Sequence, residues 1–344
     1  MILILVLSIV MLGMVLFPFF MARTTMENSE KFSLIVRSDN KRDPRYFANA
    51  FNTMMRRALE SYDGSGRIQL SKKERLLDAV QLEQMPAEEP CEMLVAAKDD
   101  FCPVGKRSFE KEIYCARSAV LPEGTCLRAI ACGKRLTLGD GCTVYRWADG
   151  AESMMVGKGC DLGISASSDT LLVVDTQTAF HRLYAAEIRI GNEPVRPPLP
   201  PCPDTIHAQM EHTISEVEPG ELVERTIIAR DDLRIGEDAQ ILGSIKGHHR
   251  VHVCRGARIA GNLIANDTIV LEDDVYVGGI LFSQENLFIG PGSQIGREGR
   301  IKSAIAKTSV YLAEQVRIYG YVGCEKTGET LADEEYRIRI ADEF

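Results

Sequence analysis

The chain has 344 residues and a formal net charge of −9, which gives room for about two or three domains. The acidic balance argues against a nucleic-acid-binding surface, because phosphate backbones are bound by basic faces. Aromatic residues make up only 7% of the chain, so we expect a core built from aliphatic side chains and cysteine.

The N-terminal segment, 1–22, carries no charged side chain. A helix of this length is long enough to span a bilayer core of about 30 Å. A cleaved signal peptide is the alternative, but no basic segment and no clear small-x-small cleavage site support it. We therefore expect a transmembrane anchor at residues 1–22. The basic residues that follow the apolar segment are Arg23, Lys31, Arg37, Lys41, Arg42 and Arg45. By the positive-inside rule they predict a single-pass protein of the cell membrane whose C-terminal body is cytoplasmic.

Residues 23–90 are predicted to form a small juxtamembrane helical region. Asp43 can cap a helix and Pro44 suits its first turn. The apolar stripe of that helix would contain Phe47, Phe51, Met54 and Ala58. A second helix is expected from Ser71, which forms a capping-box pattern with Glu74. Its apolar residues would be Leu76, Leu77 and Val80. We expect these helices to pack on each other or to cap the structure that follows.

An 18-residue repeat dominates the C-terminal half, where Ile/Val-x-Gly steps recur at residues 241–243, 259–261 and 277–279. Apolar residues recur in register with the glycines and lie two apart, which is the period of a strand with one buried face. Three short strands per repeat predict a parallel β-solenoid with 18-residue coils. Each glycine would stand at a corner, where a Cβ is expected to collide with converging side chains such as Ile241 and Ile245.

The same period occurs earlier, in the pairs at residues 136 and 138, 154 and 156, and 172 and 174. One more coil is expected at Ile113 and Cys115, which precede Leu136 and Leu138 by more than one period and leave room for a loop around residues 122–124. A comparable slip separates Ile295 from Ile318. The predicted organisation is a first solenoid at 91–191, a Pro-rich spacer at 192–221, a second solenoid at 222–324, and an acidic tail or capping strand at 325–344.

Cysteine and histidine are the candidates for chemistry. Cys115, Cys142 and Cys160 fall at inward positions and are expected to be structural thiols rather than zinc ligands. Several units resemble the motif of hexapeptide-repeat acyltransferases, at residues 235–239, 138–142 and 289–293. Such enzymes use a histidine base, and the second solenoid offers His248, His249 and His252. His252 alternates with inward valines and the other two lie at a corner, so we expect no catalytic residue, no metal site and no cofactor.

The second solenoid resembles the bactofilins, a family of bacterial polymer-forming cytoskeletal proteins. The resemblance lies in residues 257–265, 269–271 and 275–281, with their Val/Ile-x-Gly-x-Ile/Leu steps and the proline-containing segment before them. It implies a β-helical core that polymerises end to end. The long N-terminal part, residues 23–221, departs from that family's compact form.

Taken together, the sequence predicts a membrane-anchored scaffold that self-associates through its solenoid ends and binds envelope-related proteins. The expected self-association residues are Leu233 and Ile235 at one end, and Val316, Ile318 and Val322 at the other. Capping of one end by the first solenoid would limit polymerisation. The alternatives are a hexapeptide-repeat acyltransferase and a solenoid binding module that does not polymerise.

Overall fold

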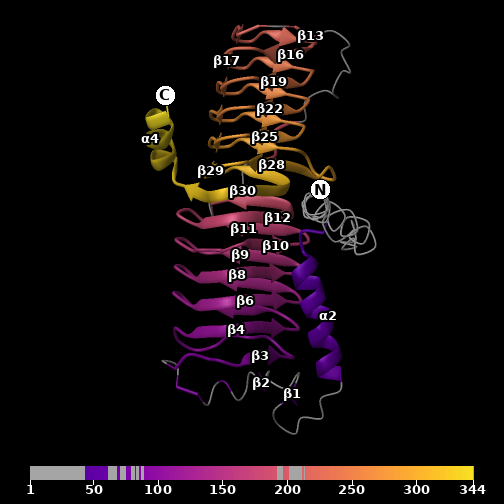
Figure 1. The fold of residues 1–344 in the computed structure, drawn as a ribbon, viewed down its shortest axis with the longest axis vertical. Helices are drawn as coiled ribbons and strands as arrows, with labels where there is room; N and C mark the ends of the chain where they lie inside the picture. Colours follow the sequence, from indigo (N-terminus) through magenta and orange to yellow (C-terminus); the bar gives the residue numbers. More distant parts are fainter. Residues whose placement is uncertain are drawn as a thin grey trace, which may run out of the picture. The chain divides into compact units, whose positions relative to one another are not determined.

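A computed structural model describes residues 43–60, 68–69, 75–78, 82, 85–86, 89–191, 197–200, 211–212 and 214–343 (Figure 1). The chain divides into two compact units, Met1–Tyr46 and Phe47–Phe344. Nearly all described elements belong to the second unit. Within the described part of the chain, no helix is both long and apolar enough to cross a membrane. The predicted span at residues 1–22 lies outside the described residues.

The second unit consists mainly of parallel β-coils, as the 18-residue period predicted. The N-terminal solenoid contains β2 (Arg75–Asp78), β3 (Leu94–Ala97), β4 (Ser108–Cys115), β5 (Ala119–Leu121), β6 (Cys126–Cys132), β7 (Arg135–Leu138), β8 (Thr143–Gly150), β9 (Ser153–Val156), β10 (Ser165–Ser168), β11 (Leu171–Val174) and β12 (Ala179–Ile190). A short strand, β1 (Ile68–Gln69), pairs antiparallel with β2.

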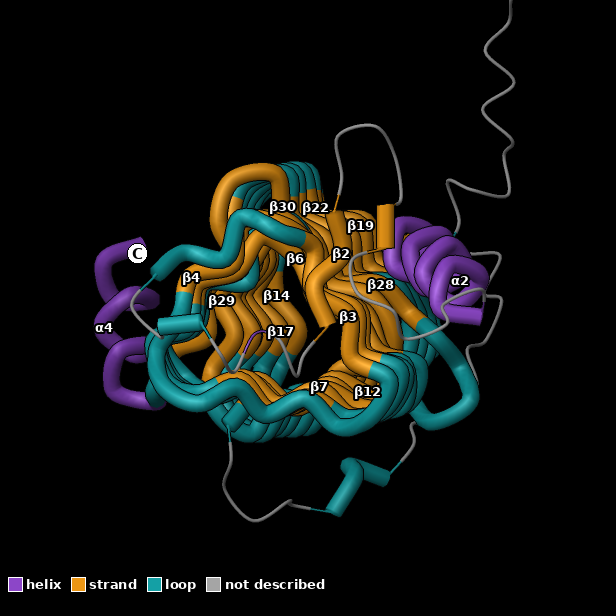
Figure 2. Tube along the Cα trace, turned by 90° about the horizontal axis from the view of Figure 1, so that it is seen from below, coloured by secondary structure: helices purple, strands orange, loops and turns teal. Residues whose placement is uncertain are grey.

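The C-terminal solenoid begins at residue 211, earlier than the predicted boundary at 222. It contains β13 (Glu211–His212), β14 (Glu216–Val217), β15 (Leu222–Val223), β16 (Thr226–Ala229), β17 (Leu233–Ile235), β18 (Gln240–Ile241), β19 (Ile245–Gly247), β20 (Val251–Val253), β21 (Arg258–Ile259), β22 (Leu263–Ala265), β23 (Ile269–Leu271), β24 (Tyr276–Val277), β25 (Leu281–Ser283), β26 (Leu287–Ile289), β27 (Gln294–Ile295), β28 (Lys302–Ala306), β29 (Ser309–Ala313) and β30 (Arg317–Leu331). Strands of successive coils superpose in the view along the stack, with helices α2 (Tyr46–Glu60) and α4 (Asp333–Glu343) outside the ring that they form (Figure 2).

The corner glycines are required by the backbone of the neighbouring coil. A Cβ on Gly243 would lie 2.4 Å from the carbonyl oxygen of Arg225, and a Cβ on Gly261 would lie 2.4 Å from that of Gly243. The expected collision with the Ile241 and Ile245 side chains is therefore wrong in its partner, although a Cβ is indeed excluded. Consecutive coils approach so closely at this corner that only glycine fits.

The spacing of the early coils differs from the prediction. Ile113 pairs with Ile130 and Ala119 pairs with Leu136, so these coils are slightly shorter than the regular period and need no inserted loop. Residues 122–124 form an ordinary corner, where the amide of Gly124 donates to the carbonyl of Asp140 at 2.8 Å. The later slip is confirmed, because Ile295 pairs with Ile318 across the insertion.

One predicted helix is present, with a rotated buried face. Helix α2 (Tyr46–Glu60) follows Asp43, whose carboxylate accepts a hydrogen bond from the Arg45 amide at 2.8 Å. Its buried residues are Ala48 and Met55, whereas Phe47 and Met54 are 67% and 47% exposed. Met55 packs in a cluster formed by Leu94, Ala96 and Tyr114 of the N-terminal solenoid, with Phe51 and Leu59 beside it. The buried face of the helix is therefore selected by the solenoid residues that it contacts, and the sequence of the helix does not contain that information.

The second predicted helix is wrong where the structure describes it. Leu76 and Leu77 belong to strand β2, which pairs in parallel with β3 through Leu76 to Leu94 and Leu77 to Val95. Ser71, Glu74 and Val80 lie outside the described residues. The local capping-box signal is outweighed by hydrogen bonding to the edge of the solenoid.

Part of the proline-rich spacer lies on the outer face of the C-terminal solenoid. Leu199 packs against a small cluster of Leu242, Ala260 and Tyr276, and its amide donates to the side-chain oxygen of Gln294 at 2.8 Å. Residues 197–200 are therefore bound to the surface of the C-terminal solenoid and do not act as a free linker.

Candidate functional site

The ends of the two solenoids are the parts of the fold that bear on self-association. Strand β12, in the last coil of the N-terminal solenoid, pairs antiparallel with β30, in the last coil of the C-terminal solenoid. Ile188 pairs with Ile318 and Leu183 with Val322, and all four side chains are fully buried. The two solenoids are therefore joined through their C-terminal coils into one hydrophobic core.

Polar contacts at this junction fix its register. The amide of Ile190 donates to the carbonyl of Val316 at 3.0 Å, and the amide of Thr178 donates to the hydroxyl of Thr330 at 2.9 Å. Glu187 of β12 accepts from Arg317 of β30 at 3.0 Å, and Arg317 is only 8% exposed. Because buried polar groups are costly unless they are paired, these contacts specify one alignment of the two coils.

The predicted self-association residues do not occupy free ends. Val316, Ile318 and Val322 lie at the junction and are covered by β12 of the same chain. Leu233 and Ile235 lie in β17, which pairs with β14 on one side and β20 on the other. The assumption that these positions form open contact coils is thus corrected. The N-terminal solenoid caps the end that carries Val316, Ile318 and Val322, as the sequence had suggested for one end.

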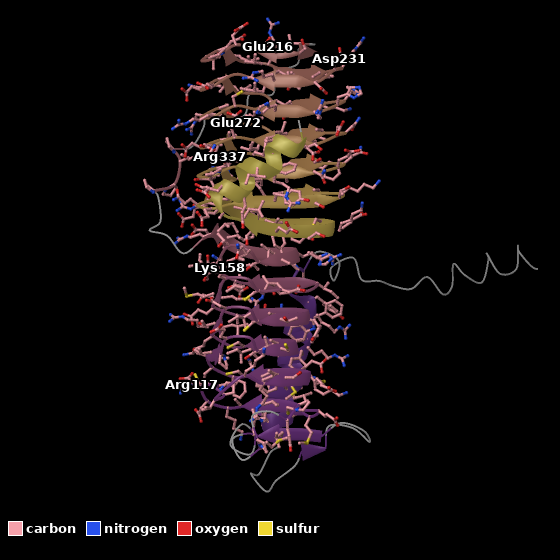
Figure 3. The ribbon with its side chains drawn as sticks, turned by 90° about the vertical axis from the view of Figure 1, so that its left-hand side faces the viewer. Arg117, Lys158, Glu216, Asp231, Glu272 and Arg337 are labelled. Atoms are coloured by element: carbon pink, nitrogen blue, oxygen red, sulfur yellow. The ribbon has the colours of Figure 1, made fainter. Side chains whose placement is uncertain are left out.

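In the part of the chain that the structure describes, the first strands of the C-terminal solenoid have an unpaired edge. Among the described residues, each of β13, β14 and β15 pairs with only one strand, namely β16, β17 and β18. Along β14, the backbone groups of successive residues point alternately toward and away from the next coil. The carbonyls of Ser215 and Val217 accept hydrogen bonds from amides of that coil. The amide and carbonyl of Glu216 therefore point away from the stack. Figure 3 shows Glu216 near this end of the solenoid.

The segment predicted as an acidic tail or capping strand, 325–344, is a strand up to Leu331, where it belongs to β30 and pairs with β12, and a helix after that. Helix α4 (Asp333–Glu343) lies on the outer face of the C-terminal solenoid. Tyr336 packs edge-on against Phe288 with 6.5 Å between ring centroids, and its hydroxyl donates to the carbonyl of Leu271 at 2.7 Å. Complete burial raises the pKa of Tyr336 well above its ordinary value. Arg337 adds an ion pair to Asp273 at 2.9 Å.

The cysteines lie mainly inside the coils, as expected for structural thiols. Cys115, Cys142 and Cys160 are buried, and the described cysteines are free thiols. Cys132 stacks in register on Cys115. The neighbouring Cys115 thiol and burial raise the pKa of Cys132, so this thiol stays protonated at neutral pH.

The three candidate histidines lie on the outside of the C-terminal solenoid. His248 and His249 are exposed at a corner, and His252 alternates with buried Val251 and Val253 as predicted. His252 lies beside two other possible metal ligands, Cys254 and Glu272. Sequence reasoning missed this group because it compared histidines only with histidines one coil away.

Comparisons of this chain with protein families, with curated proteins and with solved structures gave no match. Functional inference therefore depends on the geometry of the fold.

Proposed function

We propose that this chain is a self-associating scaffold whose contact surface is the unpaired edge formed by β13, β14 and β15. The observation that carries the proposal is this edge, in which three strands of one coil each have a partner on one side only among the described residues. Exposed strand edges pair readily with other strands. The resemblance to bactofilins points in the same direction.

The closed junction limits the form of the assembly. Because the other end of the C-terminal solenoid is covered by β12, head-to-tail stacking of C-terminal solenoids is blocked. A second copy would instead meet the edge of β13–β15 with its own β13–β15. Such a contact is isologous and closes into a dimer rather than an open filament. The antiparallel pairing of β12 with β30 shows that two coils of this kind can join in opposite directions.

The proposal includes a membrane anchor at residues 1–22, a cytoplasmic body and envelope-related partners. These parts rest on the apolar N-terminal segment, on the basic residues after it and on the family resemblance. The hexapeptide-type acyltransferase is the weaker alternative, because His248 and His249 stand on an exposed corner rather than in a cleft.

The test is the assembly state of the full chain measured by sedimentation velocity, with a Glu216→Pro variant. Proline removes the outward amide of Glu216 without removing a bond to the next coil. Glu216→Ala is the matched control, because it removes the same carboxylate and keeps the amide. We expect the wild-type chain and Glu216→Ala to form dimers and Glu216→Pro to shift toward monomer.

A wild-type chain that sediments as a monomer at micromolar concentrations would favour the non-polymerising binding module. Equal assembly of Glu216→Pro and Glu216→Ala would show that the contact lies elsewhere. Long filaments seen by electron microscopy would contradict closure into a dimer.

A further inference from the structure

We propose that His252, Cys254 and Glu272 form a binding site for a divalent transition-metal ion of the zinc type. The three donor atoms, an imidazole nitrogen, the thiol sulfur and a carboxylate oxygen, lie within 4.8 Å of one another. Nitrogen, sulfur and carboxylate oxygen are the ligands that Zn²⁺ takes in proteins. The proposal is independent of the scaffold function.

The coil geometry explains why these residues meet. His252 and Cys254 lie two positions apart along the end of β20, so both point out of the core on the same side. Val253 pairs with Leu271 in the next coil, which places Glu272 beside Cys254. A His-x-Cys step with a Glu one full coil after the Cys therefore assembles three ligands from two adjacent coils.

The carboxylate is already aimed at the imidazole. One oxygen of Glu272 lies 2.7 Å from Nε2 of His252, and the other accepts a hydrogen bond from the amide of Arg255 at 3.0 Å. The backbone contact holds the carboxylate in place, as outer partners of metal ligands do. With metal–ligand bonds of about 2.0 to 2.3 Å, donor atoms stand about 3.3 to 3.7 Å apart in a tetrahedral site. The His252–Glu272 contact would therefore open by less than about 1 Å.

Burial and charge also suit a cation. Cys254 is 1% exposed, whereas the side chains of His252 and Glu272 are 22% and 35% exposed, so the site is reached from solvent through these two. Arg234 pairs in register with His252 from the preceding coil, whereas Glu272 lies in the following coil, and the charge of Arg234 opposes a cation. On binding, the Cys254 thiol proton leaves to solvent, and thiolate plus carboxylate balance the two positive charges of the ion.

Three protein ligands leave a fourth position for water. The ion would cross-link two adjacent coils on the outer face near α4, where Figure 3 places Glu272 and Arg337. Binding to the folded chain alone would raise its melting temperature with increasing Zn²⁺ concentration.

The experiment is titration of the purified full chain with Co²⁺, which reports thiolate ligation through a charge-transfer absorption in the near ultraviolet. We expect about one equivalent to bind, and Zn²⁺ to displace it because thiolate and imidazole ligands suit Zn²⁺. Cys254→Ser should abolish the absorption. His252→Gln and Glu272→Gln should weaken binding at least as much as the loss of an outer partner, about 10- to 100-fold.

His249→Gln and Cys102→Ser are the matched controls, because they remove an exposed histidine of the same coil and an exposed thiol elsewhere. Both should bind Co²⁺ as the wild type does. The proposal is overturned if saturating Co²⁺ gives no thiolate absorption, or if the absorption persists in Cys254→Ser. Should that variant fail to fold by circular dichroism, unchanged binding in both His252→Gln and Glu272→Gln would overturn it equally.

Discussion

Residues that meet across the junction between the two solenoids should contribute to stability in a coupled way, and this coupling free energy can be measured. Ile188 of β12 and Ile318 of β30 are register partners and are both fully buried. Replacing either by alanine removes buried methyl groups and leaves a cavity, which costs about 2 to 5 kcal/mol. With a urea m-value of about 3 kcal/mol/M, the unfolding midpoint would fall by about 0.7 to 1.7 M.

A double-mutant cycle isolates the contact. We expect Ile188→Ala and Ile318→Ala together to destabilise the chain by about 0.5 to 3 kcal/mol less than the sum of the single changes, because the second substitution enlarges a cavity that the first has opened. Ile259, fully buried in a coil away from the junction, supplies the control. Ile188→Ala with Ile259→Ala should be additive within about 0.5 kcal/mol.

The assay has a built-in reporter, because the single tryptophan, Trp147, lies in β8 of the N-terminal solenoid. In stacked repeats stability is approximately a sum of nearest-neighbour terms, so a weakened interface separates the transitions on its two sides. Tryptophan fluorescence and far-ultraviolet circular dichroism should give coincident urea transitions in the wild type and separated ones in Ile318→Ala. Additivity of the Ile188 and Ile318 changes, or an unshifted midpoint in both probes, would refute the coupling.

Three further predictions concern the helix, a corner and an acidic pair. Tyr336→Phe should lower the free energy of unfolding by about 0.5 to 1.5 kcal/mol, because one hydrogen bond to Leu271 is lost. Tyr336→Ala should lower it by about 3 to 5 kcal/mol, as for other buried aromatic residues. Hydrogen exchange of α4 measures both changes, and equal effects would contradict the anchoring role of the ring. Gly261→Ala should cost about 1 to 3 kcal/mol, because the added Cβ meets backbone, and a thermal melt unchanged from the wild type would show that the corner can relax. A hydrogen bond with Asp267 raises the pKa of Glu285 above its ordinary value of 4.5. The stability that this hydrogen bond contributes to the fold is present below that pH and is lost as the pH rises through the pKa of Glu285 in the folded state. Glu285→Gln should therefore melt above the wild type at pH 7 in low salt and with it at pH 4, and a difference of the same size at both pH values would disprove this linkage.

The periodic part of the fold could be predicted because each coil meets its own equivalent. In a parallel stack, Val251 pairs with Ile269 and Ile269 with Leu287, so one 18-residue period encodes strand positions, inward side chains and long-range contacts together. The outward placement of His252 followed from the same alternation. Its partners were missed because Glu272 lies 20 residues from it, diagonally rather than in direct register.

The predictions were wrong where a residue packs or pairs with a part of the fold that lies outside the repeat. Ser71 and Glu74 carry a helix-capping signal, yet the chain directly after them pairs with β3 as a strand. The face of α2 is chosen by Tyr114 and its neighbours in the solenoid rather than by the stripe through Phe47 and Met54. Local patterns do not contain these partners.

The sequence by itself determined that the chain coils, where most strands run and which side chains face the core, because a repeat carries its own contacts. Only the tertiary structure decided how the coils end. The antiparallel pairing of Ile188 with Ile318 joins positions that lie far apart in the chain and share no period. Nothing along the chain signals such a contact, because it depends on the shape and unpaired edges of two finished stacks. Among the described residues, the unpaired edge therefore lies at strands β13, β14 and β15 rather than at the residues that the sequence proposed.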